Sequence, residues 1–463
     1  MQVKHAPAAV SVSFDDSNLV SVAGLVPVMR LAASAGLAEL AQQRLTVPTD
    51  KGANAGVKVS SLVAGMLAGA DSIDDMNVLR HGGMKTLFGG VYAPSTLGSF
   101  LRSFTFGHVR QLDAVASRVL GGLAAVAPLL GEPGRAVFVD VDDTVIEVHG
   151  HQKQAAGFGY TGVRGLNVLI ATATTAQTAP VIIGSRLRRG KVNSPRGSGP
   201  FIAEALGTLK RLPGAHGRRV IVRADSGFYT RALVAATLRA GADVSVTVKN
   251  GPSVRAAIDA IDEAAWARIR YPQAVRDEQT GEWISDADVA ETTFTAFTGK
   301  GRGPGDIPGR LIVRRVKAHQ DPGLFDTWRY HAFFTTVAAD VTDVVEADRA
   351  HRAHAIIEQV HADLKNGPLA HLPSGKFHAN GAWLALATIA FNLARTAAAI
   401  ADPGGRLAKA TTATIRRTLI ALPARLARSA RRIVLHLPVA WPWEAAFARL
   451  FTATHAPPRP TQT

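Results

Sequence analysis

Three acidic residues occupy positions where a carboxylate is costly unless it serves chemistry. Asp142 lies in a strand-like run at 136–146, Asp225 ends the apolar run at 220–225, and Glu358 follows two isoleucines in a helical pattern. Burying a lone carboxylate is unfavourable unless a cation compensates its charge. Three carboxylates on one side of a sheet repel one another, and divalent cations with oxygen ligands relieve that repulsion. We therefore predict that these three residues form a Mg²⁺ site.

The chemistry expected of such a site is phosphoryl transfer. Two Mg²⁺ ions about 4 Å apart lower the pKa of a bound water or 3′-hydroxyl and stabilise the leaving oxygen of an in-line displacement. Asp142, Asp225 and Glu358 are accordingly predicted to be both catalytic residues and metal ligands, and Mn²⁺ is expected to substitute for Mg²⁺. Each acid alone also fits a strand-end turn or a solvated helix face, so the prediction depends on the three together.

The elements that must position these acids read as an α/β core. Strand patterns at 136–146, 166–173, 180–184, 219–225 and 244–248 alternate with helical patterns at 201–212 and 230–240, which is typical of α/β sheets. Ligand sites in open α/β sheets lie beyond strand ends, where Asp225 stands directly before Ser226 and Gly227. A long amphipathic helix at 341–366 carries Glu358, and an apolar helix follows at 380–400. Asn392 and Arg395 interrupt that helix, which favours a buried helix over a membrane span.

The chain divides into five predicted regions. Residues 1–131 read as an all-helical DNA-binding domain, with helices expected at 25–43, 59–67 and 95–126. The core is expected at 132–251 and again at 329–402, where a last strand and the catalytic helices lie. A β-rich insertion at 252–328 separates the two parts, and a basic region occupies 403–463.

Composition favours a globular protein with a polyanionic partner. The 463 residues are 47% hydrophobic and carry a net charge of +16. Such a charge favours nucleic acid, because each cation set against a phosphate releases counterions. The lack of cysteine excludes disulfides, thiolate metal sites and cysteine nucleophiles. The first residues show no secretory signal, so a cytoplasmic, nucleoid-associated protein is expected.

Basic residues gather in two acid-free stretches. No Asp or Glu occurs from 148 to 203 or from 403 to 443. A solvated basic face explains either stretch alone, but both together favour DNA. The predicted phosphate contacts in the two stretches are Arg188, Arg189, Lys191, Arg416 and Arg417.

Three sequence blocks resemble the DDE transposases of bacterial insertion sequences, in the branch with a Tyr-Arg-Glu-Lys signature and the group numbered thirteen-eighty. Asp140-Val-Asp142-Asp-Thr144 is similar to the family's first motif, Arg223-Ala-Asp225-Ser-Gly227 to its second, and the run from Ile357 to Gly367 to its third. The order of the blocks also agrees, with the longer gap between the second and the third.

The resemblance implies a ribonuclease-H-like fold with Asp142, Asp225 and Glu358 as metal ligands, and Lys365 as a DNA contact near the scissile phosphate. It implies a transposase that binds terminal inverted repeats in double-stranded DNA and performs metal-dependent strand cleavage and strand transfer. It further implies a homodimer in a synaptic complex.

The third block departs from the family at two positions. His351 stands where the family has Tyr and His354 where it has Arg, with Arg352 close by. These three residues are predicted to contact DNA, and protonated imidazoles would make activity fall as pH rises past about 6.5.

Other interpretations stay open at this point. His354, Glu358 and His361 share a helix face and fit a zinc site. The first block also fits a haloacid-dehalogenase-like phosphatase, in which Asp140 would be the nucleophile. A non-catalytic DNA-binding relic of a transposase is a third possibility. Trp283 and Trp328 flank the insertion as candidates for stacking on a flipped base, with core packing as the alternative.

Overall fold

The computed structural model describes residues 9–48, 50–159, 162–269, 287–298, 306–317, 328–430 and 432–455. Its α-helices are α1 (Leu25–Ser34), α2 (Leu37–Arg44), α3 (Ala55–Ala68), α4 (Met84–Leu87), α5 (Pro94–Arg102), α6 (Phe106–Val126), α7 (Ser198–Lys210), α8 (Arg231–Arg239), α9 (Pro252–Asp259), α10 (Val344–Arg352), α11 (Ile356–Lys365), α12 (Phe377–Ala401), α13 (Thr412–Ile415) and α14 (Glu444–His455). Its strands are β1 (Leu19–Val20), β2 (Val137–Glu147), β3 (Gly157–Phe158), β4 (Arg164–Thr174), β5 (Val181–Arg188), β6 (Val220–Ala224), β7 (Asp243–Thr247), β8 (Ala267–Ile269), β9 (Ala287–Ala296), β10 (Ile307–Lys317), β11 (Trp328–Thr335), β12 (Ala424–Ser429) and β13 (Arg432–His436).

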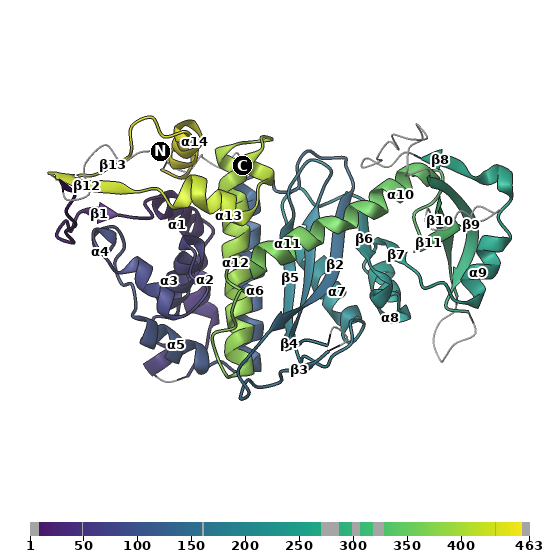
Figure 1. The fold of residues 1–463 in the computed structure, drawn as a ribbon, viewed down its shortest axis with the longest axis horizontal. Coiled ribbons are helices and arrows are strands. Elements are labelled where there is room, and N and C mark those ends of the chain that lie inside the picture. The colour runs from purple at the N-terminus through teal and green to yellow at the C-terminus, as the bar shows by residue number, and fades with distance from the viewer. Residues whose placement is uncertain are drawn as a thin grey trace.

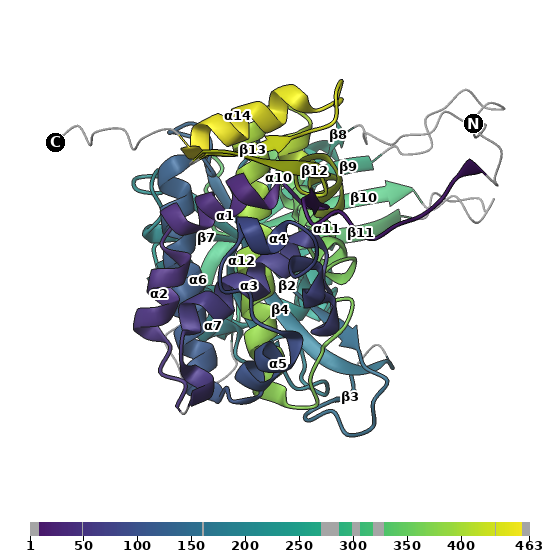
Figure 2. The ribbon, with the colours of Figure 1, turned by 90° about the vertical axis from the view of Figure 1, so that its left-hand side faces the viewer.

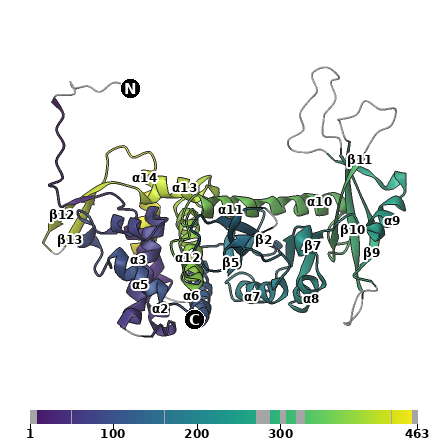
Figure 3. The ribbon, with the colours of Figure 1, turned by 60° about the horizontal axis from the view of Figure 1, so that its bottom comes forward.

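A mixed sheet runs through the middle of the elongated molecule (Figure 1). Strand β4 pairs antiparallel with both β2 and β5, while β2, β6 and β7 are mutually parallel neighbours. The almost completely buried run of β4 suits a strand that is covered on both faces. Helices α10 and α11 cross one face, and α7 and α8 cover the other (Figure 3). The mixed α/β class expected from the sequence is therefore confirmed.

The insertion expected at 252–328 extends this sheet in its described strands. Strand β11 pairs antiparallel with β7, and β10 and β9 follow in the same sheet. The described strands of this region thus continue the core sheet rather than form a sheet of their own. The domain boundaries drawn from the sequence stay predictions. Trp283 lies outside the described residues.

Two of the predicted helices near the N-terminus are interrupted. Gly36 has a φ of +76° and separates α1 from α2, a conformation that glycine adopts without strain. Thr105 begins α6 with a capping box that includes the side chain of His108. The region predicted to be all-helical also contains β1, which pairs with β12 near the other end of the chain. In Figure 2, β12 and β13 lie between α14 and the N-terminal helices.

The helix predicted at 341–366 is two helices with a 3-10 turn at Ala353–Ala355 between them. Helix α12 lies behind them and packs against α6, β5 and α3. Among the described residues it is the one helix long and apolar enough to cross a membrane, but 89% of its most apolar window is buried. The side chain of Asn392 accepts a hydrogen bond from the Ile182 amide and donates one to the Ile182 carbonyl, both at 2.8 Å. The prediction of a buried helix at 380–400 is confirmed.

Candidate active site

Asp142 and Asp225 lie side by side where the parallel pairing of β2 and β6 stops. Asp225 follows the last residue of β6, whereas Asp142 lies in the middle of β2 and not at the strand end that the sequence suggests. The register of β2 and β6 ends with Val141 opposite Ala224, so the next residues along the two strands are these two aspartates. Partial burial and the nearby charge of Asp142 both raise the pKa of Asp225. The two carboxylates therefore repel each other, which is the condition that a divalent cation relieves.

Each of these aspartates has one oxygen held by the backbone. The Asp143 amide donates to Oδ1 of Asp142 at 2.7 Å, and the Gly227 amide donates to Oδ1 of Asp225 at 2.9 Å. These bonds fix one oxygen of each carboxylate and leave the second oxygen of each to bind other partners. Carboxylate oxygens are the ligands that Mg²⁺ prefers.

Helix α11 lies over β2 and contributes further groups to this edge. His361 Nε2 is 3.4 Å from Oδ2 of Asp142. Partial burial lowers the pKa of Lys365, whereas the charge of Asp142 acts in the opposite direction, so the two groups interact electrostatically. Glu358 lies one turn before His361 on the same helix face and its side chain is exposed.

The structure thus brings Asp142, Asp225, His361 and Lys365 together, while Glu358 points into solvent beside them. In the described part of the chain, no three His, Asp or Glu side chains are close enough to one another to hold a metal ion. The zinc interpretation is not supported, because His354 turns away from Glu358 and bonds Asp140.

A buried ion cluster lies directly beneath the two aspartates. Arg223 donates to both oxygens of Asp140 at 2.7 and 2.8 Å, and His354 Nδ1 lies 2.8 Å from Oδ1. Burial alone would raise the pKa of Asp140, but Arg223 and His354 together hold it below its usual value. With its oxygens bonded and its side chain fully buried, Asp140 does not suit the nucleophile of a phosphatase.

His351 lies partly buried in the same region, and its contacts differ from the DNA contact predicted for it. Its ring stacks on Phe333 with centroids 4.0 Å apart, and its two nitrogens lie 2.8 and 3.0 Å from the hydroxyls of Ser245 and Thr247. Burial, assisted by the charge of His354, lowers the pKa of His351 to about 3. A neutral ring with both nitrogens occupied does not fit the predicted role of a protonated phosphate ligand.

Arg188 also departs from its predicted role. Its guanidinium forms an ion pair with Asp143 and donates to Asn167 at 2.8 Å and to the backbone oxygens of Ser194 and Arg196. The Arg188 side chain is 8% exposed. It therefore braces the loop after β5 from inside, and it is not available to a DNA phosphate without breaking this network.

The other predicted DNA contacts lie nearer the surface. Arg189, Lys191 and Arg417 are exposed, and Arg416 is partly buried against Gly69. Arg352 forms an ion pair with the buried Asp348 at 2.8 Å.

Strands β12 and β13 form a basic two-stranded ribbon near the C-terminus. The register pairs Arg425 with His436 and Ala427 with Val434, and these residues share one face because antiparallel partners point the same way. On the opposite face Leu426 and Leu435 pack against the core. Arg428 and Arg432 lie toward the tip and are exposed.

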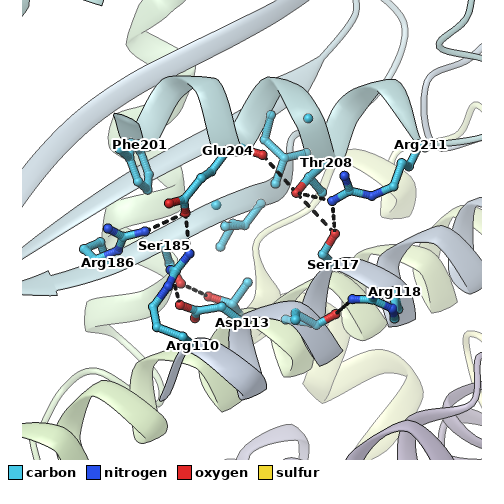
Figure 4. Close-up of a pocket in the computed structure, with 17 residues that line it drawn as sticks. Arg110, Asp113, Ser117, Arg118, Ser185, Arg186, Phe201, Glu204, Thr208 and Arg211 are labelled. Carbon is cyan, nitrogen blue, oxygen red and sulfur yellow. Dashed lines mark hydrogen bonds and ion pairs between the residues drawn. The ribbon is translucent and has the colours of Figure 1, made fainter. Parts of the chain in front are cut away.

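A polar cavity of about 280 Å³ lies apart from the aspartates, between α6, α7 and β5 (Figure 4). Arg110 bonds Asp113 at 2.7 Å and Glu204 at 2.5 Å, and Arg186 bonds Glu204 at 2.7 Å. This network ties the helical N-terminal region to the core. Arg186, part of the basic stretch seen in the sequence, is thus committed to an internal contact.

Sequence reasoning missed two residues of this region. Arg223 interrupts an apolar strand, which is a signal for a buried partner charge. The sequence offers His361 only as a zinc ligand. Its position between Glu358 and Lys365 on one helix face could have indicated that it lies next to Asp142.

Comparison with known proteins identifies the family of the chain. No curated protein matches the chain. The family model described as transposase DDE domain group 1 matches residues 3–457, nearly the whole length. The chain therefore belongs to the DDE transposase family.

Proposed function

We propose that this chain is the transposase of an insertion sequence, that it binds the terminal inverted repeats of the element, and that it catalyses strand cleavage and strand transfer. The observation that carries the proposal is the adjacency of Asp142 and Asp225 directly after the last paired residues of β2 and β6, in a chain of this family. The order β5-β4-β2-β6-β7, antiparallel in its first part and parallel in its second, supports a ribonuclease-H-like core.

Asp142, Asp225 and Glu358 are the proposed catalytic residues and ligands of two Mg²⁺ ions, with Mn²⁺ as a substitute. The donor set fits, since the two aspartates repel each other and their carboxylate oxygens are the ligands that Mg²⁺ prefers. Such ions supply an activated water or 3′-hydroxyl and neutralise the charge of the leaving oxygen. The proposal requires the exposed Glu358 to turn toward Asp142 when metal and DNA bind.

The remaining groups hold the DNA. Lys365 stands within the field of Asp142 and is the proposed contact to the phosphate next to the scissile bond. The exposed cations Arg189, Lys191 and Arg417 and the basic ribbon of β12 and β13 are proposed to bind the duplex backbone. Two copies of the chain in a synaptic complex are proposed from the family resemblance.

The test separates chemistry from binding. Asp142→Asn, Asp225→Asn and Glu358→Gln should each abolish cleavage of a duplex that carries the element's terminal repeat, while binding of that duplex stays nearly unchanged. Glu346→Gln is the matched control, because Glu346 is a surface acid on α10 that pairs with Arg349. Loss of duplex binding in all three variants would contradict the assignment.

A second measurement addresses the non-catalytic alternative. An excision assay with the intact element should yield rejoined donor DNA and inserted copies for the natural chain. Binding without excision in the presence of Mg²⁺ or Mn²⁺ would favour a relic that retains only the duplex contacts.

A further inference from the structure

His361 is a buried side chain whose polar atoms lack partners. Its side chain is 8% exposed, and neither ring nitrogen has a hydrogen-bond partner among the described residues. Leaving a buried polar group unsatisfied costs about 1–3 kcal/mol. An orphaned group of this kind in a folded protein calls for an explanation, and a bound ion is one of the recognised explanations.

The ring points to the carboxylate that the proposed function makes a metal ligand. His361 Nε2 is 3.4 Å from Asp142 Oδ2, longer than the 2.7–3.2 Å of an ordinary N–H···O hydrogen bond. The other oxygen of Asp142 already accepts from the Asp143 amide. Two ligands that each stand about 2.1 Å from a shared ion lie about 3.0–3.4 Å apart for bond angles between 90° and the tetrahedral angle. The observed separation is therefore compatible with two ligands of one ion.

We infer that His361 Nε2 is a metal ligand beside Asp142. This inference rests on the proposed function and extends it, since the family resemblance assigns only carboxylates to the metal. On α11 the ring stands between Glu358 one turn earlier and Lys365 one turn later, so it lies on the face that covers the end of β2.

A nitrogen ligand changes which ion the site prefers. Mg²⁺ favours oxygen ligands, whereas imidazole suits transition metals, and affinity rises from Mn²⁺ to Co²⁺ at a given nitrogen-containing site. The site should therefore bind Mn²⁺ and Co²⁺ more tightly than Mg²⁺, and this preference should depend on His361.

The experiment measures Mn²⁺ bound to the full chain without DNA. Electron paramagnetic resonance gives the free Mn²⁺ concentration, and electron spin-echo envelope modulation detects a ¹⁴N nucleus bound to the ion. In the natural chain we expect ¹⁴N modulation. In His361→Gln we expect the modulation to vanish and the Mn²⁺ affinity to fall at least tenfold, with a smaller change for Mg²⁺. Glutamine retains a hydrogen-bond donor near Asp142, so a ring that only positions Asp142 would be replaced with little loss of Mn²⁺ affinity.

His371→Gln is the matched control, because His371 Nδ1 lies 3.3 Å from Asp71 in a similar but exposed pair. The His371→Gln variant should keep both the Mn²⁺ affinity and the ¹⁴N modulation, and thermal melting in EDTA should show that both variants are folded.

Modulation that persists in His361→Gln, or its absence from the natural chain, would overturn the inference. If Asp142→Asn loses Mn²⁺ while His361→Gln keeps it, the inference alone fails. If Asp142→Asn keeps Mn²⁺ at full affinity, the proposed function fails with it.

Discussion

Arg223 binds both carboxylate oxygens of Asp140, and these two residues precede the two aspartates of the candidate site by two positions in their strands. The guanidinium also donates to the backbone oxygen of Ala350 in α10 and lies over the ring of Phe138. The pair therefore joins two core strands to the helices that carry the third acidic block.

Removal of Arg223 should destabilise the protein strongly. Arg223→Leu leaves the fully buried Asp140 without its main cation, and breaking such a pair costs about 3–5 kcal/mol. Urea unfolding measures the change in the free energy of unfolding. The double variant Arg223→Leu, Asp140→Leu removes both charges and should recover part of the loss. A single variant as stable as the natural chain would show that the buried pair has no such role.

Divalent metal should stabilise the natural chain and not the Asp225→Asn variant. In the natural chain Mn²⁺ at about 100 times its Kd adds about 2.7 kcal/mol to the free energy of unfolding. The variant removes one of two repelling charges, so in EDTA its melting temperature should be higher than that of the natural chain. Differential scanning calorimetry measures both effects. An equal Mn²⁺-induced shift in the two proteins would place the ion elsewhere.

His351 should stay neutral across the physiological range. Burial holds its pKa near 3, so its ring should show no titration between about pH 5 and pH 8 in ¹⁵N-histidine NMR spectra. His351→Phe should identify its signals. An activity profile that falls above about pH 6.5 would then arise from another group, and a His351 titration midpoint near 6.5 would contradict the buried placement.

Two neighbouring arginines should behave in opposite ways. Arg188→Ala leaves Asp143 buried without its cation and should lower the free energy of unfolding by about 3–5 kcal/mol. Arg189→Ala changes an exposed side chain and should leave stability unchanged. If Arg189 contacts a phosphate, its loss should reduce the slope of log affinity against log salt by about 0.9. Fluorescence anisotropy at several salt concentrations tests this, and an unchanged slope would remove Arg189 from the interface.

Asp113 should make the stability depend on pH. Burial raises its pKa from 3.8 to about 6, although Arg110 acts in the opposite direction. A raised pKa in the folded state gives a contribution that is fully present below pH 3.8 and is lost as pH rises through about 6. Asp113→Asn should therefore flatten the stability profile between about pH 4 and pH 6. Asp75→Asn is the control, because hydrogen bonds to Ser72 lower the pKa of Asp75 and its contribution has the opposite sign. Identical profiles for the natural chain and Asp113→Asn would exclude this role.

The core strands could be predicted from the sequence because their β-branched runs are long and bounded by turn residues. The sequence predicts that Asp142 and Asp225 meet at one site of an α/β sheet, but only the structure shows that β2 and β6 are parallel neighbours and that β2 continues past Asp142 to Glu147. The break between α10 and α11 could not be predicted, since the 3-10 turn at Ala353–Ala355 contains neither Gly nor Pro. The helix periodicity there continues on both sides of the turn.

The roles of the basic residues were harder to predict. Arg188 is the last residue of β5 and Arg189 follows it, and only the tertiary structure shows that Arg188 is buried against Asp143 while Arg189 is exposed. His351 and His354 likewise look equivalent in the sequence. His351 stacks on Phe333 and lies beside two hydroxyl groups, whereas His354 bonds Asp140. The 3-10 turn at Ala353–Ala355 separates the two environments.

The pairing of β1 with β12 affects how the chain can be synthesised and shortened. Val20 meets Ala424, so the first strand of the protein finds its hydrogen-bonding neighbour only after nearly all of the polypeptide has left the ribosome. Contacts so far apart in the chain form slowly. A product that stops before β12 would keep the two-aspartate edge but leave Val20, which is 2% exposed in the complete fold, without its cover. Prematurely terminated chains should therefore fold poorly and be degraded readily by proteases.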